Sequence, residues 1–222
     1  MDVLEAIKSR NSVRGYKSIP VAKDMLKEII EIACRAPSDV NVQPWEITVV
    51  TGEVLDNIKR GNIDKLTSGE VPNPEVPHHR YEGKYRQRQR DLAVQLFGLM
   101  GIARDDVSKR TEWRQRGFRF FDAPAAIILS TDKSIPGLRS QFDVGSITYA
   151  ICLAALSYGL GTCIEDQGVS FPDVIRKYVN IPDYKRIVIG IAIGYPDWDF
   201  PANRLQSERE PVDHVINWCG FG

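Results

Sequence analysis

The residues best suited to chemistry lie near the start of the chain, in the run Arg10-Asn11-Ser12-Val13-Arg14. An arginine guanidinium presents a planar set of donors that suits phosphate and carbonyl oxygens, and a serine hydroxyl adds an uncharged donor. The run could therefore hold an anionic ligand that carries a phosphate. The alternative is a solvated basic turn, because short motifs of this kind often arise by chance.

Familiar hydrolytic and nucleotide-binding motifs are missing. The sequence has no GxSxG, HExxH or GxxxxGK pattern, and Gly159-Leu160-Gly161 lacks the third glycine of a dinucleotide fingerprint. The chain contains 3 histidines and 4 cysteines. The cysteines lie far apart without a CxxC pair, so we predict no metal site. If the protein is an enzyme, a bound cofactor is expected to carry the reaction.

Composition excludes several classes of protein. The 29 basic and 29 acidic residues balance, whereas a nucleic-acid-binding domain is usually basic. A charge-free run at residues 144–164 is interrupted by polar residues and by Gly159, which favours a buried helix followed by a strand over a membrane span. Unpaired cysteines and an acidic start without a signal peptide favour the cytoplasm.

Apolar spacing and turn residues outline the secondary structure. Helical spacing predicts helices at about residues 2–9, 23–35, after Gly52, and at 84–102, 105–118, 143–158, 171–178 and 211–218. Runs of β-branched residues predict strands at 46–51, 125–130, 161–164 and 187–193. Residues 68–83, rich in proline and glycine, are expected to form an irregular loop, and 201–209 an extended tail.

The order of these elements indicates an α+β fold. We expect a mixed central sheet of four to five strands surrounded by helices, within one domain that spans residues 1–222. The region 68–118 is expected to combine an irregular loop with two helices. Its basic cluster at residues 86–90 could meet the phosphates of a nicotinamide cofactor, but a solvated helix face is the favoured interpretation.

Four segments together resemble a known family. They are the Arg10–Arg14 run, residues 37–45 (PSDVNVQPW), residues 190–196 (GIAIGYP) and residues 204–209 (RLQSER). In this order and spacing they are similar to the FMN-dependent nitroreductase family, and PSxxNxQPW is the most specific part. The resemblance covers roughly residues 3–218 and is weakest over 68–118, which it implies is a variable insertion of helix and loop over the active site.

The resemblance implies a set of FMN-binding residues at the phosphate and the flavin ring. The phosphate and ribityl chain would be held from both ends of the sequence, by Arg10, Asn11, Ser12, Ser207 and Arg209. The flavin ring would be bordered by Arg14 at its pyrimidine edge, by a cation before the second strand, and by a strand crossing its centre: Arg14, Arg119, Cys163, Ile164 and Glu165.

Individual residues of this set have alternatives. A cation beside flavin N1 and O2 stabilises the reduced ring, and Arg119 matches that position, with Arg116 as a second candidate. Arg119 could instead be an ordinary exposed charge. The backbone N–H of Glu165 would donate to flavin N5, so no side chain is predicted to act as catalytic acid or base. Cys163 is expected to pack in the core rather than to act as a redox thiol.

The resemblance also implies partners and an activity. The loop with Pro37, Ser38 and Asn41 would reach the flavin of a second chain, which makes the expected assembly an intertwined homodimer. The activity would be transfer of hydride from NADH or NADPH to FMN, then reduction of nitroaromatic or quinone acceptors by a ping-pong mechanism. Alternatives are reductive dehalogenation, flavin processing, or a non-catalytic FMN-binding module.

Overall fold

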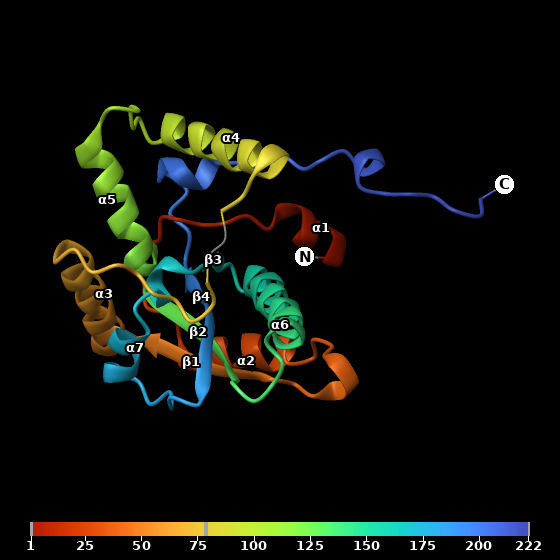
Figure 1. Ribbon diagram of the computed structural model, residues 1–222, viewed down its shortest axis with the longest axis horizontal. Coiled ribbons are helices and arrows are strands. Elements are labelled where there is room, and N and C mark those ends of the chain that lie inside the picture. Colours follow the sequence, from red (N-terminus) through yellow and green to blue (C-terminus); the bar gives the residue numbers. More distant parts are fainter. Residues whose placement is uncertain (1, 78–79, 222) are drawn as a thin grey trace.

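A central antiparallel sheet organises the protein. The computed structural model describes residues 2–77 and 80–221 (Figure 1), so that His78 and His79 of the proline-rich loop lie outside the described residues. The sheet has the order β1-β2-β4-β3, with every pairing antiparallel. Its strands are β1 (Trp45–Thr51), β2 (Ala125–Asp132), β3 (Gly161–Glu165) and β4 (Lys185–Gly194). All four correspond to predicted strands.

The Arg10–Arg14 run joins the sheet at its β3 edge. Ser12 forms a parallel bridge with Thr162, and Tyr16 forms an antiparallel bridge with Pro196 just beyond β4. This isolated bridge is a parallel pairing at the edge of the sheet, whose four strands are all antiparallel to their neighbours. The first chemical motif of the sequence is therefore held in register with β3 rather than lying in a free turn.

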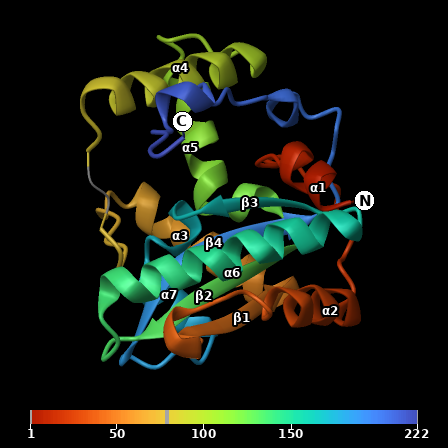
Figure 2. The same ribbon diagram turned by 90° about the vertical axis from the view of Figure 1, so that its right-hand side faces the viewer.

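Helices cover both faces of the sheet. The described helices are α1 (Val3–Ser9), α2 (Lys23–Ala33), α3 (Gly52–Thr67), α4 (Gly83–Leu99), α5 (Val107–Phe118), α6 (Gly137–Ser157) and α7 (Pro172–Tyr178). Figure 2 shows α6 lying across one face beside α2, and α3, α5 and α7 lie on the other side. The chain thus buries both faces of its central strands.

The burial of β2 and β4 explains their continuous apolar sequence. Along β2, Ile127 and Leu129 pack in the cluster with α2 and α6, whereas Ile128 points to the cluster with α3 and α7. Successive side chains of a strand alternate between its faces, so a strand with two covered faces needs apolar residues at every position.

Two helix predictions need correction. Helix α6 begins at Gly137, directly after Pro136, and not near Asp143 as the apolar run predicts. The predicted helix at 211–218 is wrong, because only a 3-10 turn forms at Val212–His214. Val212, Val215 and Trp218 are all exposed there, so the segment has no core contact to stabilise a short helix.

The region 68–118 forms an outer layer of α4 and α5, joined to the body by an anchored loop. Asn73 N–H donates to Ser170 O at 2.9 Å, and a carboxylate oxygen of Glu75 accepts from Ile187 N–H at 2.7 Å. The far half of α4 packs through Leu96 against Ala202 and Leu205. None of the helices in the described part of the chain combines the length and hydrophobicity needed to cross a bilayer.

Candidate active site

A buried asparagine that sequence reasoning missed fastens the Arg10–Arg14 run. The Oδ1 atom of Asn203 accepts from the N–H groups of Arg14 (2.7 Å) and Gly15 (3.1 Å). Its Nδ2 donates to Gly15 O at 2.8 Å and to Asp197 O at 2.7 Å. No periodic pattern marks Asn203 in the sequence. Asn203, from the segment after β4, thereby fixes the backbone at the end of the Arg10–Arg14 run.

The arginines of this run keep their positive charge uncompensated. Among the described residues, Arg10 and Arg14 form no ion pair, although both are half-buried. The Nη1 atom of Arg14 donates to Ser12 O at 3.2 Å, and its guanidinium lies 5.9 Å from the centre of the Phe121 ring. Partly desolvated guanidiniums without a carboxylate favour an anionic ligand, and this donor set suits a phosphate.

The two buried cysteines beside these arginines are neutral. Burial raises the pKa of the Cys163 thiol to about 12, although Arg14 opposes that shift. Burial also raises the pKa of Cys152, and here Arg10 acts in the opposite direction. A thiol with a raised pKa is a poor nucleophile at neutral pH. Cys163 is 3% exposed and packs in the core, as the sequence predicts.

The end of α5 carries two more arginines, which share one carboxylate. Asp122 pairs with Arg119 Nε at 2.7 Å and with Arg116 Nη1 at 2.9 Å. Arg116 also donates to Arg14 O at 3.2 Å, so it is the α5 cation in direct contact with the Arg10–Arg14 run. Burial lowers the pKa of Arg116, while the hydrogen bond with Asp122 raises that of Arg119.

The backbone after α5 is strained. Phe120, Phe121 and Asp122 have φ values of 53°, 53° and 60°. Residues other than glycine rarely adopt this left-handed region, and each such residue costs on the order of 1 kcal/mol or more. The segment is held because Phe120 is fully buried and Phe121 nearly so. Such strain often occurs at functional sites, and here it lies directly beside Arg119.

At the end of β3 an exposed residue lies between two buried ones. Ile164 is 40% exposed, whereas the neighbouring Cys163 and Glu165 point into the core. The Oε2 atom of Glu165 accepts from Gly168 N–H at 2.8 Å. Burial raises the pKa of Glu165 to about 8, so the carboxyl is mostly protonated at neutral pH. With its side chain turned inward, Glu165 can offer only its backbone to a ligand outside the sheet.

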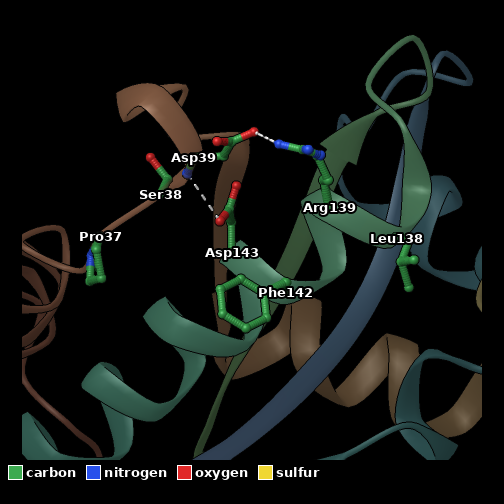
Figure 3. Close-up of a pocket in the computed structure, with 7 residues that line it drawn as sticks. All are labelled: Pro37, Ser38, Asp39, Leu138, Arg139, Phe142 and Asp143. Atoms are coloured by element: carbon green, nitrogen blue, oxygen red, sulfur yellow. Dashed lines mark hydrogen bonds and ion pairs between the residues drawn. The ribbon is translucent and has the colours of Figure 1, made fainter.

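The loop with Pro37, Ser38 and Asn41 lies in a different part of the chain. A cavity of about 480 Å³ separates it from the start of α6, and Figure 3 shows Asp39 directed towards Arg139 across it. The lining residues are Pro37, Ser38, Asp39, Leu138, Arg139, Phe142 and Asp143. Asp143 Oδ1 accepts from Asp39 N–H at 3.2 Å, and Asp39 forms an ion pair with Arg139.

This loop and the Arg10–Arg14 run lie at opposite ends of α6. The loop contacts Asp143, whereas Arg10 acts on Cys152. These positions on α6 are separated by about 14 Å along the helix axis, at about 1.5 Å of rise per residue. One chain therefore does not bring the loop and the arginines to the same point.

Ser207 and Arg209 contact each other on the exposed tail. Arg209 Nη1 donates to Ser207 Oγ at 2.7 Å, and neither side chain forms a hydrogen bond or ion pair with residues 10–14 in the described chain. The tail is attached to α4 through Glu210, which pairs with Arg88 and with His214 Nδ1 at 2.9 Å. Figure 1 shows the tail continuing beyond α4 and away from the body.

Comparison with known proteins identifies the family. The model of the nitroreductase family matches residues 7–195. The chain belongs to this family. A 4-nitrobenzoate reductase from Nocardioides sp. (strain LMS-CY) is 32% identical over 225 residues, covering 96% of this chain and 87% of the relative. A nitrobenzene nitroreductase from Ectopseudomonas oleovorans is also 32% identical, covering 96% of this chain and 95% of its own.

A solved nitroreductase structure has nearly the same fold. The FMN and NADPH-dependent nitroreductase NfnB from Sphigopyxis sp. strain HMH superimposes with a TM-score of 0.95 at 30% identity, covering 100% of both chains. The superposition includes α4 and α5, although their sequence resembles the family least. The outer layer is thus a shared part of the architecture of these two nitroreductases.

Proposed function

We propose that this nitroreductase is an FMN-dependent oxidoreductase that takes hydride from NADPH or NADH and reduces nitroaromatic compounds or related acceptors. The observation that carries this proposal is the pair of half-buried arginines in the run that is bridged to β3, which have no ion-pair partner among the described residues. When bound there, FMN supplies the hydride chemistry, and the protein supplies binding, orientation and electrostatics.

The phosphate would be bound by donors of the Arg10–Arg14 run. Arg10 supplies charge, and Ser12 and Asn11 supply neutral donors. Asn203 holds the backbone of the run, so these donors are arranged before the ligand binds. Such preorganisation lowers the entropy that binding costs.

The flavin ring would lie against the end of β3. The N–H of Glu165 would face N5, and Arg14 would border the pyrimidine edge. Arg119, or Arg116 through its contact with Arg14, would stabilise negative charge on that edge. Because Asp122 neutralises part of this charge, the pairing of Asp122 with the two arginines is expected to set how strongly the site favours reduced flavin.

A complete site would need two chains. The loop with Pro37, Ser38 and Asn41 is too far from the arginines of its own chain, and Leu138 and Phe142 beside it are 86% and 78% exposed. In a symmetric homodimer this face of α6 would be covered, and the loop would reach the partner's flavin. Ser207 and Arg209, on the projecting tail, would complete the phosphate site in the same assembly.

The named relatives favour nitroaromatic acceptors. Two of them are a nitrobenzoate reductase and a nitrobenzene nitroreductase, and each aligns with nearly the whole of this chain. Dehalogenation, flavin processing and flavin binding without turnover are the competing outcomes of the stopped-flow experiment described below.

Four free cysteines agree with a cytoplasmic protein.

Anaerobic stopped-flow reduction tests the activity. The purified, FMN-loaded protein should lose its yellow colour when mixed with NADPH or NADH, and a nitroarene should restore it in a second mixing step. Protein that remains colourless after incubation with FMN would refute the proposal. Bound flavin that neither nicotinamide bleaches would indicate a binding module, and turnover of halophenols alone would indicate a dehalogenase.

A matched pair of arginine variants tests the location of the site. Arg10→Ala should weaken FMN binding by at least about tenfold, since a charge-assisted contact contributes roughly 1.5–3 kcal/mol. Arg60→Ala is the control, because Arg60 is an exposed arginine on α3. Titration of the apoprotein with FMN, followed by quenching of flavin fluorescence, measures both affinities. Equal affinities for the two variants would place the phosphate elsewhere.

A further inference from the structure

A fully buried asparagine on α3 joins two segments that border the proposed flavin site. Asn62 is 0% exposed, and its Nδ2 donates to Phe118 O at 2.9 Å and to Gly168 O at 2.8 Å. Phe118 is the last residue of α5. Gly168 lies in the 3-10 turn Gln167–Val169, directly after β3. One amide group therefore links the end of α5 with the turn after β3.

Each of the two linked segments adjoins a residue that the proposed function requires, Arg119 after α5 and Glu165 at the end of β3. Phe118 is followed by Arg119 and by the strained residues 120–122. Gly168 N–H donates to Glu165 Oε2 at 2.8 Å, so the position of Gly168 sets that of the Glu165 carboxyl. On the flavin side, Glu165 carries the N–H proposed to face N5.

The two segments are in close contact, at Gly117 through the flexible Gln167 side chain and at Gly168 through the buried Phe120 ring. A Cβ added at Gly117 would lie 1.8 Å from Gln167 Oε1. A Cβ added at Gly168 would lie 2.6 Å both from Glu165 Oε1 and from the Phe120 ring. A shift of the turn after β3 would therefore displace the end of α5 as well, because interiors packed this tightly transmit displacement.

We propose that Asn62 is a positioning residue, which fixes the Glu165 backbone relative to the arginines of α5 by holding Phe118 O and Gly168 O together. This inference rests on the proposed function, since it assigns both segments to one flavin. The residue acts from behind the site and touches no proposed ligand.

An asparagine at this buried position has a free-energy cost. Its Oδ1 is buried without a hydrogen-bond partner in the described chain. Leu55 and Ile58 on the same helix show that α3 is otherwise buried through apolar residues. A buried unsatisfied polar atom is unfavourable, and leucine at position 62 would remove it, but it would leave Phe118 O and Gly168 O without this donor. The hydrogen bonds of Nδ2 with Phe118 O and Gly168 O account for the amide. No neighbouring side chain in the described chain is shown to donate to these carbonyls in its place.

Hydrogen exchange of the apoprotein tests the link without activity. Asn62→Leu should speed amide exchange in peptides covering 116–122 and 165–170 together, by on the order of tenfold through local opening. Ile29→Ala is the control, because Ile29 is fully buried in the cluster on the opposite face of the sheet. Exchange unchanged in either peptide, or raised equally in the control, would overturn the proposal.

The FMN-loaded protein supplies the second readout. With the rate expressed per bound flavin, reduction of Asn62→Leu by saturating NADPH should be slower by on the order of tenfold, since small displacements from reactive geometry have large effects on rate. The affinity for NADPH should change less than the rate. Asn62→Ser keeps one donor and should show a smaller effect, and it serves if the leucine variant does not fold.

Failure of the inference is distinguishable from failure of the proposed function. If the wild-type protein is yellow and bleached by NADPH while both Asn62 variants match it in rate and exchange, the positioning role is wrong and the function stands. If the wild-type protein binds no FMN, the proposed function fails, and the inference that rests on it fails too.

Discussion

Replacing Glu165 by glutamine should stabilise the protein in a way that depends on pH. The folded-state pKa of about 8 lies above the ordinary value of 4.5, so between these pH values the folded protein holds a proton that the unfolded chain has released. The stability of the wild type therefore falls as pH rises through this window, by about 1.4 kcal/mol per pH unit. Glutamine has nearly the same shape and does not ionise, so Glu165→Gln should escape this loss.

The size of the effect follows from the width of the window. From about pH 5 to about pH 7.5, the difference in the free energy of unfolding between Glu165→Gln and wild type should grow by about 3 kcal/mol in favour of the variant. For a chain of this length, that corresponds to a difference in Tm of roughly 6–12 °C. Because other titrating groups are shared, they cancel in the comparison.

Thermal unfolding of both proteins at a series of pH values, at equal protein concentration, measures the difference. Glu75→Gln is a matched control. Burial opposes ionisation of Glu75, but the Ile187 N–H and Arg176 outweigh it and lower its pKa. Wild-type Glu75 therefore stabilises the fold above its unfolded pKa and loses that effect as pH falls, so the Glu75→Gln deficit should shrink towards acid pH. A difference between Glu165→Gln and wild type that stays constant with pH would show that Glu165 is ionised in the fold, and would refute the reasoning.

Two further substitutions test the framework around the site. Asn203→Ala should lower the free energy of unfolding by about 3 kcal/mol, because it leaves buried backbone groups of Gly15 and Asp197 without partners; urea denaturation that finds less than about 1 kcal/mol would contradict this. In the proposed homodimer, Phe142→Asp should shift the equilibrium from dimer towards monomer, because a carboxylate on the exposed face of α6 opposes apolar association. Sedimentation velocity measures this, with the equally exposed Val107→Asp on α5 as control, and an unchanged dimer would show that this face is not the interface.

The sheet could be predicted from the sequence because the burial of its central strands is visible as runs of apolar residues. Residues 125–129 of β2 and 187–193 of β4 are apolar at every position, and such runs are typical of strands that are covered on both faces. The apolar pattern predicts a start for α6 that is too late in the sequence. The first turns of the helix, with Leu138 and Phe142 exposed, show no apolar face directed to the core. The C-terminal segment has apolar residues at helical spacing, yet nothing covers them in one chain, so spacing alone predicted a helix that does not form.

The site residues divide in a similar way. Arg10, Ser12 and Arg14 could be named from the sequence, because their donors are visible as residue types within one short run. Asn62 and Asn203 could not, because an asparagine acquires its role only when the backbone groups it binds are brought to it from distant segments. The ion pairs of Asp122 with Arg116 and Arg119 likewise depend on the strained turn after α5.

By itself, the sequence determined the elements, the basic run and the family, because these depend on local spacing and on motifs that residue types display directly. Only the tertiary structure decided that Glu165 turns its carboxyl into the core, that Arg116 rather than Arg119 contacts the Arg10–Arg14 run, and that the loop at residues 37–41 lies at the far end of α6. All three features depend on which residues are buried and on contacts between residues far apart in the chain. Neither can be seen in the linear sequence.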